Sequence, residues 1–374
     1  MRYGEFRHCG KARHSREATL RSPEERLKKI WEGERTAGAS ALRLLSLPYG
    51  AAVALRNRLY DRGLIRQTKL PCPVISVGNL TVGGTGKTPT VIFIANLLKE
   101  RGYRPAVLSR GYGGNVKASV NIVSDGNRVL LGWRDAGDEP ILIAGAAPGV
   151  PVLTGSRRLL TGRAAVGRFG ADVLILDDAF QHRALFRNLD IVLADAVRPF
   201  GNGFILPRGP LREMPEALRR AHLLIRTGAE ADPTDPLQGA SGLPSFRGIH
   251  RPLGLVEAGT GRVLPLAELK GRRVCAFAGI GRPEAFRRSL TGLGAEFASF
   301  RAFPDHHPYS RTDIDALRRL ADENGAGRIV TTEKDAVRLA DHPDFLAEVS
   351  FLRIGMEISP AEPFAELIFS RLAY

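Results

Sequence analysis

A glycine-rich loop that follows a short apolar run has the residue types needed to hold phosphate groups. The run covers residues 74–77, and residues 78–89 read GNLTVGGTGKTP. Glycines at three positions allow backbone N–H groups to converge on phosphate oxygens, while Lys87 reaches the β- and γ-phosphates and Thr88 ligates Mg²⁺. The pattern predicts a nucleoside triphosphate site. The residues expected to line it are Thr81, Val82, Gly83, Gly84, Thr85, Gly86, Lys87 and Thr88.

Two adjacent carboxylates end another apolar run. Residues 173–176 read VLIL and are followed by Asp177 and Asp178. A buried strand that ends in aspartate supplies the Mg²⁺ side of many phosphate-loop sites, although the same pattern also occurs at ordinary turns and helix caps. The phosphate loop favours the metal interpretation. His182, five residues after Asp177, is interpreted either as a phosphate contact or as a structural histidine.

A second acidic pair precedes a predicted helix at residues 141–146. Asp138 and Glu139 stand before Pro140. Asp138 is a suitable base for the proton of an attacking hydroxyl, but acidic residues and proline are also typical of a helix N-terminus. Farther along, residues 303–309 read FPDHHPY, and a histidine from this turn is a candidate partner for such a base. Arginines after strands are candidate phosphate clamps; those singled out are Arg157 and Arg212.

Short apolar runs alternate with helix-length segments, which predicts parallel strands joined by helices. The runs cover residues 74–77, 106–108, 152–153, 173–176, 191–194 and 223–225. This order is typical of a doubly wound, mostly parallel α/β sheet with ligands at the carboxyl ends of its strands. After a predicted linker at 228–243 we expect a hairpin (254–257 and 262–264) and a second, smaller α/β portion. Its predicted strands are 273–278 and 328–331, and its predicted helices lie near 283–293 and 311–324.

The N-terminal part of the chain is strongly basic. Residues 1–70 contain 16 Lys or Arg against 7 Asp or Glu, in a chain whose formal net charge is +15. Such a segment indicates an anionic partner, either a membrane or a nucleic acid. Its uncharged, apolar run at 44–55 is shorter than the roughly 20 residues that span a bilayer, but suits a helix in the membrane interface. A helix packed on its own domain is the alternative. The three scattered cysteines favour a reducing, cytoplasmic environment.

Eight motifs occur in the order found in the tetraacyldisaccharide 4′-kinase family of Gram-negative bacteria, which the sequence resembles over about residues 25–374. They lie at residues 77–89, 109–114, 137–140, 177–182, 200–203, 209–213, 305–306 and 332–336. Thr81, where the general phosphate-loop pattern has glycine, matches this family's loop. Three positions depart from the family's usual residues: Ala179, Arg208 and Met214.

The resemblance implies transfer of the γ-phosphate of ATP, with Mg²⁺, to the 4′-hydroxyl of tetraacyldisaccharide 1-phosphate, giving lipid IVA in lipid A biosynthesis. It implies that Asp138 is the general base, that His306 is its partner and that Lys87 binds phosphate. The metal-side residues that it implies are Thr88, Asp177, Asp178 and Glu213. The phosphate or substrate contacts that it implies are Arg157, His182 and Arg212.

The sequence and the resemblance together predict four segments. They are a disordered extension (1–24), a basic and apolar membrane-associating helical segment (25–62), a P-loop kinase domain (63–228) and a smaller C-terminal α/β domain joined by the linker and hairpin (229–374). The expected partners are the lipid substrate and the cytoplasmic face of the inner membrane, bound peripherally, with no nucleic acid and no obligate protein partner. The alternative function is a P-loop GTPase or ATPase switch that acts on a protein partner.

Overall fold

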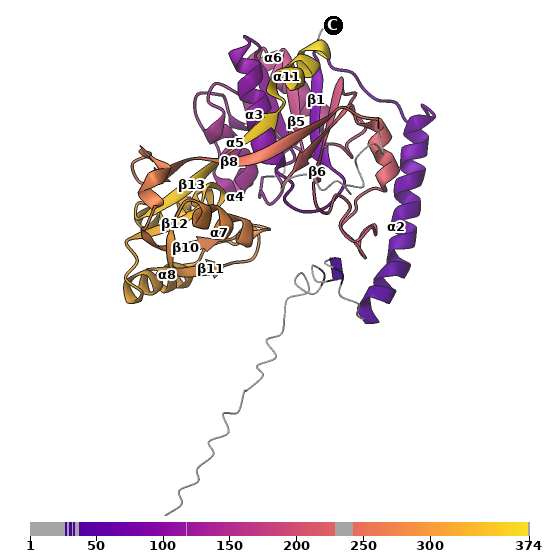
Figure 1. The fold of residues 1–374 in the computed structure, drawn as a ribbon. Helices are drawn as coiled ribbons and strands as arrows, with labels where there is room; N and C mark the ends of the chain where they lie inside the picture. Colours follow the sequence, from indigo (N-terminus) through magenta and orange to yellow (C-terminus); the bar gives the residue numbers. More distant parts are fainter. Residues whose placement is uncertain are drawn as a thin grey trace, which may run out of the picture.

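One continuous mixed sheet runs through the described part of the molecule. The computed structural model describes residues 37–116, 118–228 and 242–372, together with Leu27, Ile30, Trp31 and Gly33. Within them, 13 strands form the sheet in the order β11-β10-β12-β13-β8-β7-β6-β1-β5-β2-β4-β3, and β9 pairs with β8. The predicted extension and most of the predicted linker lie outside the described residues. Figure 1 shows a larger part, a smaller part and one long helix, α2, beside the larger part.

The larger part contains a parallel set of strands with helices on both faces. Its parallel strands are β1 (Val74–Asn79), β2 (Pro105–Ser109), β4 (Val152–Thr154), β5 (Val173–Asp177), β6 (Leu189–Asp195) and β7 (Leu223–Thr227), and β3 (Asn121–Ser124) pairs antiparallel with β4. Its helices are α3 (Lys87–Glu100), α4 (Trp133–Ala136), α5 (Asp138–Ala146), α6 (Arg158–Phe169) and the 3-10 helix η1 (Pro215–Arg220). All six predicted apolar runs are strands here, so this part of the prediction is confirmed.

The apolar runs of these strands are continuous because both faces of the sheet are covered. Neighbouring residues point to opposite faces: Ile75 packs in a core with Val91 and Ile94 of α3, whereas Val74 packs in a second core with Ala165 of α6. The two cores together fix the sheet between its helices. Side chains that follow the carboxyl ends of the strands are therefore held on a rigid edge.

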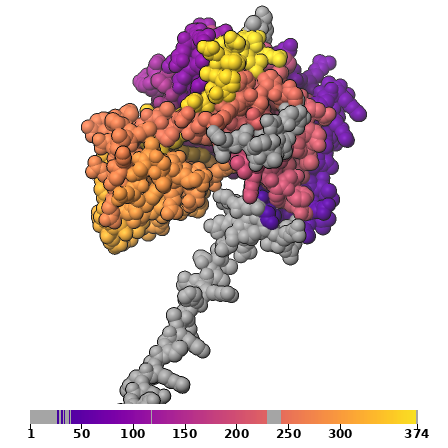
Figure 2. All heavy atoms as spheres, viewed as in Figure 1, coloured from indigo at the N-terminus to yellow at the C-terminus, as the bar shows by residue number. Residues whose placement is uncertain are grey.

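Two long strands join the larger part to the smaller part. They are β8 (Ser245–Glu257) and β13 (Val349–Ser359), which pair antiparallel along most of their length. The first residues of β8 pair with β7, and the first residues of β13 pair with β12 (Arg328–Thr332). The smaller part also contains β9 (Val263–Leu264), β10 (Arg273–Ala278), β11 (Glu296–Ala302), η2 (Leu266–Leu269), α7 (Pro283–Gly292), α8 (Arg311–Glu323), α9 (Glu333–Arg338), η3 (Leu339–Asp341) and α10 (Pro343–Leu346). Figure 2 shows it as a lobe that projects from the larger part.

The C-terminal end of the described chain returns to the larger part. Helix α11 (Ala361–Ser370) buries Phe364 and Ile368 in the same core as Ile94 of α3. The predicted hairpin is observed as β8 and β9, and the other predicted strands and helices of the smaller portion are present. The division of the chain at residue 229 stays a prediction. Helix α11 packs against α3, the helix that follows the phosphate loop. The segment 229–374 therefore does not form a separate core of its own.

Helix α2 (Ala37–Asp61) lies along one side of the larger part (Figure 1). Its buried Ser46 hydroxyl donates to the carbonyl of Ile205, and the Tyr49 hydroxyl donates to the carbonyl of Arg212. The opposite side of the helix is apolar and exposed; its leucines Leu44, Leu45, Leu47 and Leu55 are 58–69% exposed. None of the helices in the described ranges is long and apolar enough to cross a membrane.

Candidate active site

The phosphate loop connects β1 directly to α3. Gly86, the residue before the helix, has φ = 88°, a left-handed conformation that favours glycine. A Cβ atom there would lie 2.7 Å from Nε2 of His250, so a larger residue would also have to displace that side chain. Asn79, the last residue of β1, donates from Nδ2 to the Thr85 hydroxyl and accepts at Oδ1 from Lys87 Nζ at 3.2 Å. The loop therefore has a defined shape, with the lysine at the start of a helix.

Backbone contacts also fix the outer side of the loop. The Val82 N–H donates to the carbonyl of Pro210, and the Arg212 N–H donates to the carbonyl of Leu80. On the inner side, the Thr227 hydroxyl at the end of β7 donates to the carbonyl of Thr85. The Arg212 side chain is thereby placed beside the loop. The expectation that residues 81–88 contact nucleotide stays a prediction.

The two carboxylates after β5 differ in their surroundings. Asp178 accepts two hydrogen bonds from Arg212 Nη1, at 2.8 and 2.9 Å, and lies 3.6 Å from Lys87 Nζ. Burial alone would raise the pKa of Asp178, but these two cations outweigh it and hold the pKa below its ordinary value. Asp178 has φ = 47°, whereas Ala179 does not have a positive φ, so the alanine in place of the family's glycine is compatible with this turn.

Asp177 is buried, and only one of its carboxylate oxygens is satisfied. The Ser109 hydroxyl donates to Oδ2 at 3.1 Å, and Oδ1 has no hydrogen-bond partner among the described residues. Burial, followed by the charges of Glu139 and Asp178, raises the pKa of Asp177 to about 7. The unpartnered carboxylate oxygen and the hydroxyl of Thr88, in the first turn of α3, are hard oxygen donors of the kind that bind Mg²⁺. These residues fit the predicted ion.

The third predicted metal carboxylate has other partners. Glu213 is fully buried, and its two oxygens are bound by Arg56 of α2 and Arg220 of η1. The pair with Arg56 is 2.6 Å long. The described residues contain no group of three His, Cys, Asp or Glu side chains placed to hold a metal. The metal role of Glu213 stays a prediction, and the two ion pairs favour a structural role that ties α2 to the larger part.

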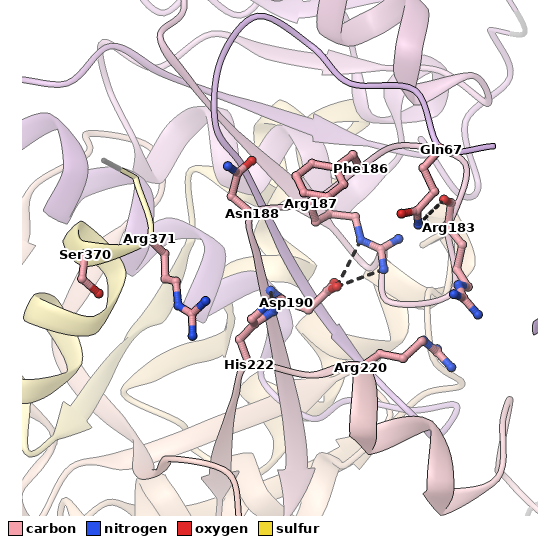
Figure 3. Close-up of a pocket in the computed structure, with 10 residues that line it drawn as sticks. All are labelled: Gln67, Arg183, Phe186, Arg187, Asn188, Asp190, Arg220, His222, Ser370 and Arg371. Atoms are coloured by element: carbon pink, nitrogen blue, oxygen red, sulfur yellow. Dashed lines mark hydrogen bonds and ion pairs between the residues drawn. The ribbon is translucent and has the colours of Figure 1, made fainter. Parts of the chain in front are cut away.

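The loop that carries His182 is supported from the opposite edge of the sheet. A cavity of about 540 Å³ lies near the amino ends of β6 and β7, and its lining residues are drawn in Figure 3. Arg187 pairs there with Asp190 at 2.9 Å. Arg187 also donates to the carbonyl of His182, and Arg183 pairs with Asp61 of α2. Arg183 and Arg187 thus have structural carboxylate partners. Burial and the neighbouring arginines lower the pKa of His182 to about 4, which leaves its imidazole neutral.

Arg157 is the arginine selected from the sequence, but the buried arginine is the next residue, Arg158. Arg157 is exposed and precedes α6, whereas the Arg158 side chain is buried and donates to the carbonyl of Gly155. Burial lowers the pKa of Arg158 to about 10, and the charges of Asp177 and Asp178 oppose that shift. Arg158 is therefore the arginine of this pair that acts electrostatically on the acidic residues. The substrate role of Arg157 stays a prediction.

A second cluster joins the two parts of the molecule. Asp138 is the first residue of α5, and His306 follows β11 in the smaller part. His306 Nδ1 lies 2.9 Å from Asp138 Oδ2, and the Asp138 carboxylate is 5% exposed. Gly137 has φ = 90°, and a Cβ atom there would lie 2.5 Å from the carbonyl oxygen of Tyr112. Only glycine allows this start of α5, which places Asp138 at its position.

Two further cations from α9 flank this pair. Lys334 Nζ lies 4.0 Å and Arg338 Nε lies 3.7 Å from Asp138 Oδ2. Burial would raise the pKa of Asp138, but the hydrogen bond with His306 and the charges of Lys334, His306 and Arg338 lower it overall. The hydrogen bond to Asp138 raises the pKa of His306, although burial and Lys334 oppose this shift. The result is a carboxylate that stays ionised beside a histidine.

The structure therefore brings the sequence-predicted residues together in two groups. Lys87, Asp178 and Arg212 are in contact, and Asp138 contacts His306. The charge of Glu139, next to Asp138, acts on Asp177 and so links the groups. Sequence reasoning missed the roles of Asn79, Arg158, Lys334 and Arg338. The family motif at 332–336 contains Lys334 and was the signal that could have identified it.

These features define a class: an α/β protein of the P-loop NTPase type, with a phosphate loop at one end of its central strand and an ionised Asp–His pair nearby. A family model described as tetraacyldisaccharide-1-P 4′-kinase matches residues 38–373. The chain belongs to this family, which confirms the resemblance seen in the sequence.

Individual relatives cover nearly the whole chain. A tetraacyldisaccharide 4′-kinase from Syntrophus aciditrophicus is 53% identical over 367 residues, covering 93% of this chain and 98% of the relative. One from Anaeromyxobacter dehalogenans is 48% identical, covering 84% of this chain and 86% of the relative. A crystal structure of the Aquifex aeolicus enzyme, described as an apo form in complex with ATP, has a TM-score of 0.76 and 36% identity, covering 89% of this chain and 99% of that chain.

Proposed function

We propose that this chain transfers the γ-phosphate of ATP to the 4′-hydroxyl of tetraacyldisaccharide 1-phosphate, giving lipid IVA in lipid A biosynthesis. The observation that carries the proposal is the 2.9 Å contact between His306 Nδ1 and Asp138 Oδ2 in a molecule with a phosphate loop. A kinase that phosphorylates an alcohol benefits from a base for the hydroxyl proton, whereas a nucleotide switch does not need one. Family membership supports the same substrate.

The phosphate loop would bind and orient the triphosphate. The N–H groups of the loop and the start of α3 would face the phosphate oxygens, and Lys87 would neutralise negative charge on the β- and γ-phosphates. Lys87 is held between Asn79 and Asp178, so its ammonium is already positioned near the loop. Arg212, fixed by Asp178, would add a second cation. Charge neutralisation and positioning are the main catalytic effects available in phosphoryl transfer.

Thr88 and Asp177 would hold Mg²⁺ on the acidic side of this site, with Asp178 close by. When bound, the ion supplies charge neutralisation at the phosphate oxygens. The unpartnered Oδ1 of Asp177 and its raised pKa support this assignment, because a cation would offset the cost of the buried carboxylate.

Asp138 would accept the proton of the 4′-hydroxyl. As that proton moves to the carboxylate, the 4′-oxygen bonds to the γ-phosphorus, the bond from the γ-phosphorus to the bridging oxygen breaks, and ADP leaves. The lowered pKa makes Asp138 a weak base. A weak base suffices because phosphoryl transfer has a loose transition state in most analyses, in which the hydroxyl loses its proton late. His306 would orient the carboxylate through Nδ1.

Helix α2 would bring the site to its lipid substrate at the cytoplasmic face of the inner membrane. Its exposed leucines lie on the side away from the larger part, and Arg43 and Arg58 are exposed at either end of the apolar stretch. An apolar face flanked by arginines is suited to the interface of an anionic membrane. The hydrogen bond from Tyr49 to the carbonyl of Arg212 would connect this helix to the nucleotide site.

The proposal is tested by the position of the new phosphate. The full-length protein is incubated with ATP, Mg²⁺ and tetraacyldisaccharide 1-phosphate in mixed micelles, and the lipid product is analysed by ³¹P NMR and fragmentation mass spectrometry. We expect a second phosphomonoester at the 4′-oxygen. ATP hydrolysis without any new lipid phosphate would favour the nucleotide switch instead.

A further inference from the structure

Lys334 lies at the centre of the contact between the two parts of the molecule. It is the second residue of α9, and its side chain is 19% exposed. Its Nζ lies 3.1 Å from Glu139 Oε1, 3.5 Å from His306 Nε2 and 4.0 Å from Asp138 Oδ2. One ammonium therefore contacts or approaches the acidic pair on α5 and the histidine. The mechanism above does not use it.

The contact with His306 restricts how that imidazole can be protonated. An ammonium carries only donors, so an imidazole nitrogen facing it can take part only by offering a lone pair. If Nε2 of His306 carries the lone pair, its single hydrogen must be on Nδ1, which faces Asp138 Oδ2. The positions of Lys334 and Asp138 on opposite sides of the ring thus favour one neutral tautomer. An imidazolium would place two cations 3.5 Å apart.

Helix α9 holds Lys334 at this place through a buried polar network. The Thr332 hydroxyl accepts from the Asp335 N–H at the start of the helix. Asp335 is fully buried and accepts from the Gly279 N–H and the Tyr309 hydroxyl. Arg338, four residues after Lys334, donates to Asp335 and to the carbonyl of Gly279. The His306 N–H donates to the same Gly279 carbonyl, so histidine and lysine share one support.

Charged groups of both signs surround the lysine and the histidine. Asp138 and Glu139 approach from α5, Asp305 from the same turn as His306, and Arg338 from α9; Tyr112 lies edge-on to the imidazole with ring centroids 6.4 Å apart. The three carboxylates favour imidazolium, and the two cations oppose it. Removal of one cation would increase the excess of negative charge around the imidazole.

We propose that Lys334 is a positioning residue of the Asp–His pair, which limits protonation of His306 and keeps the hydrogen of the neutral imidazole on Nδ1, so that Asp138 Oδ2 is held and the carboxylate stays ionised. This inference rests on the proposed function only in assigning a catalytic purpose to the Asp–His pair. The positions of Lys334, His306 and Asp138 do not depend on which reaction the protein catalyses. The charge of Lys334 lowers the pKa of both His306 and Asp138, although the hydrogen bond with Asp138 leaves the pKa of His306 raised overall. Lys334 in turn stays charged, because Glu139 and Asp138 more than offset the effect of burial on its pKa.

A simpler role for Lys334 would be an ion pair with Glu139 that joins the two parts of the molecule. The two roles give different results when the charge is removed but the length of the side chain is kept. A lysine that only joins the parts would change stability without changing the protonation of His306. A lysine that controls His306 would change its titration.

The experiment uses full-length protein with ¹⁵N-labelled histidine, with the His306 signals assigned from the loss of signals in His306→Gln. In the wild type at pH 8 we expect the ¹⁵N chemical shifts of His306 to be those of the Nδ1–H tautomer. Shifts of the Nε2–H tautomer in the wild type would by themselves overturn the proposal. In Lys334→Met, loss of a cation within 4 Å should move the His306 titration midpoint up by about one pH unit. In Lys334→Arg the midpoint should return towards that of the wild type. An unchanged midpoint in Lys334→Met would overturn the proposal.

Kinetics then test what the neutral histidine does. The acid limb of the pH profile of kcat/KM for the lipid should move up with the His306 midpoint in Lys334→Met, and the KM for ATP should stay within about twofold. NMR reads the histidine without turnover, so it decides the proposal even if the protein phosphorylates another acceptor. Failure of the proposed function would appear as a missing 4′-phosphate with the predicted titration intact. A lowered kcat with an unmoved acid limb would contradict the role in the pair.

Discussion

His306 Nδ1 and Asp138 Oδ2 lie 2.9 Å apart although 168 residues separate them in the chain. The aspartate begins a helix of the larger part, and the histidine follows a strand of the smaller part. The long strands β8 and β13 keep the two parts in one sheet and so maintain this contact.

We expect Asp138→Asn to lower kcat by about 10²- to 10⁴-fold, because the substituted amide cannot accept the hydroxyl proton. His306→Gln should have a smaller effect of the same kind, and the double variant should lose less than the product of the two effects, since both residues act on one step. Steady-state kinetics with the lipid as variable substrate provide the measurement. The KM for ATP should change little.

His307→Gln is the matched control for these variants. His307 lies next to His306 but faces Asp313 of α8, with Nε2 3.1 Å from Oδ2. Its loss should leave kcat within about threefold. A loss in this variant as large as in His306→Gln would argue against a specific Asp–His pair.

The pair should also make stability depend on pH. The folded pKa of Asp138 is lowered, so its contribution is present above its unfolded pKa of about 3.9 and is lost as the pH falls through the folded value. The folded pKa of His306 is raised, so its contribution is complete below its unfolded pKa of about 6.5 and is lost as the pH rises through the folded value. The stabilisation is therefore largest between about pH 4 and 6.5.

His306→Gln should consequently cost more free energy of unfolding at pH 5.5 than at pH 8.5. The difference should be about 1 kcal/mol or less, because the His306 side chain is 39% exposed and solvent screens the pair. Urea unfolding at both pH values measures it. An equal cost at the two pH values would show that His306 does not titrate against Asp138.

The exposed leucines of α2 should control binding to membranes. Serine at Leu44, Leu45 and Leu47, each 59–69% exposed, removes apolar area that would enter the interface. In sedimentation with anionic phospholipid vesicles, we expect the affinity of this variant for the vesicles to be at least about tenfold weaker than that of the wild type. Leu253→Ser is the control, since Leu253 is 61% exposed but lies on β8. Equal losses in the two variants would contradict an interfacial role for α2.

Glu213→Gln separates a structural role from a metal role. The substitution leaves Arg56 and Arg220 without their shared carboxylate, and breaking a buried pair should cost about 3 kcal/mol of unfolding free energy. The Mg²⁺ concentration for half-maximal activity should not change. Asp172→Asn is the control, because its pair with Arg104 is exposed and should contribute about 1 kcal/mol or less. A several-fold higher Mg²⁺ requirement with little loss of stability would favour metal binding by Glu213.

Local sequence predicted the parts of this molecule that depend on local contacts. The phosphate loop, β1 and β5 are contiguous patterns of apolar residues, glycines and a terminal acid, so Lys87 and Asp177 could be assigned before the structure was known. Helix α5 begins earlier than predicted, at Asp138 and not at residue 141, because the acidic pair forms its first turn. The positive φ of Gly137 that allows this start depends on the approach of Tyr112, which sequence does not show.

The remaining features depend on contacts between distant segments. Only residues 254–257 of the 13-residue strand β8 were predicted, because its pairing with β7 and β13 extends it towards its N-terminal end. The return of α11 to the core around α3 depends on the same strands. Lys334 reaches Asp138 only because α9 packs against α5, and the two residues lie 196 positions apart. The resemblance identified His306, which residue types alone could not select from two adjacent histidines.

The central claim is tested most directly by transfer of label from [γ-³²P]ATP to tetraacyldisaccharide 1-phosphate, with wild type and Lys87→Ala compared after thin-layer separation of the lipid. We predict labelled lipid with the wild type and a loss of at least about 10³-fold with Lys87→Ala, because the variant lacks the cation that neutralises charge in the transition state. Equal labelling by the two proteins, or no labelled lipid from a folded wild type that binds ATP, would contradict the account.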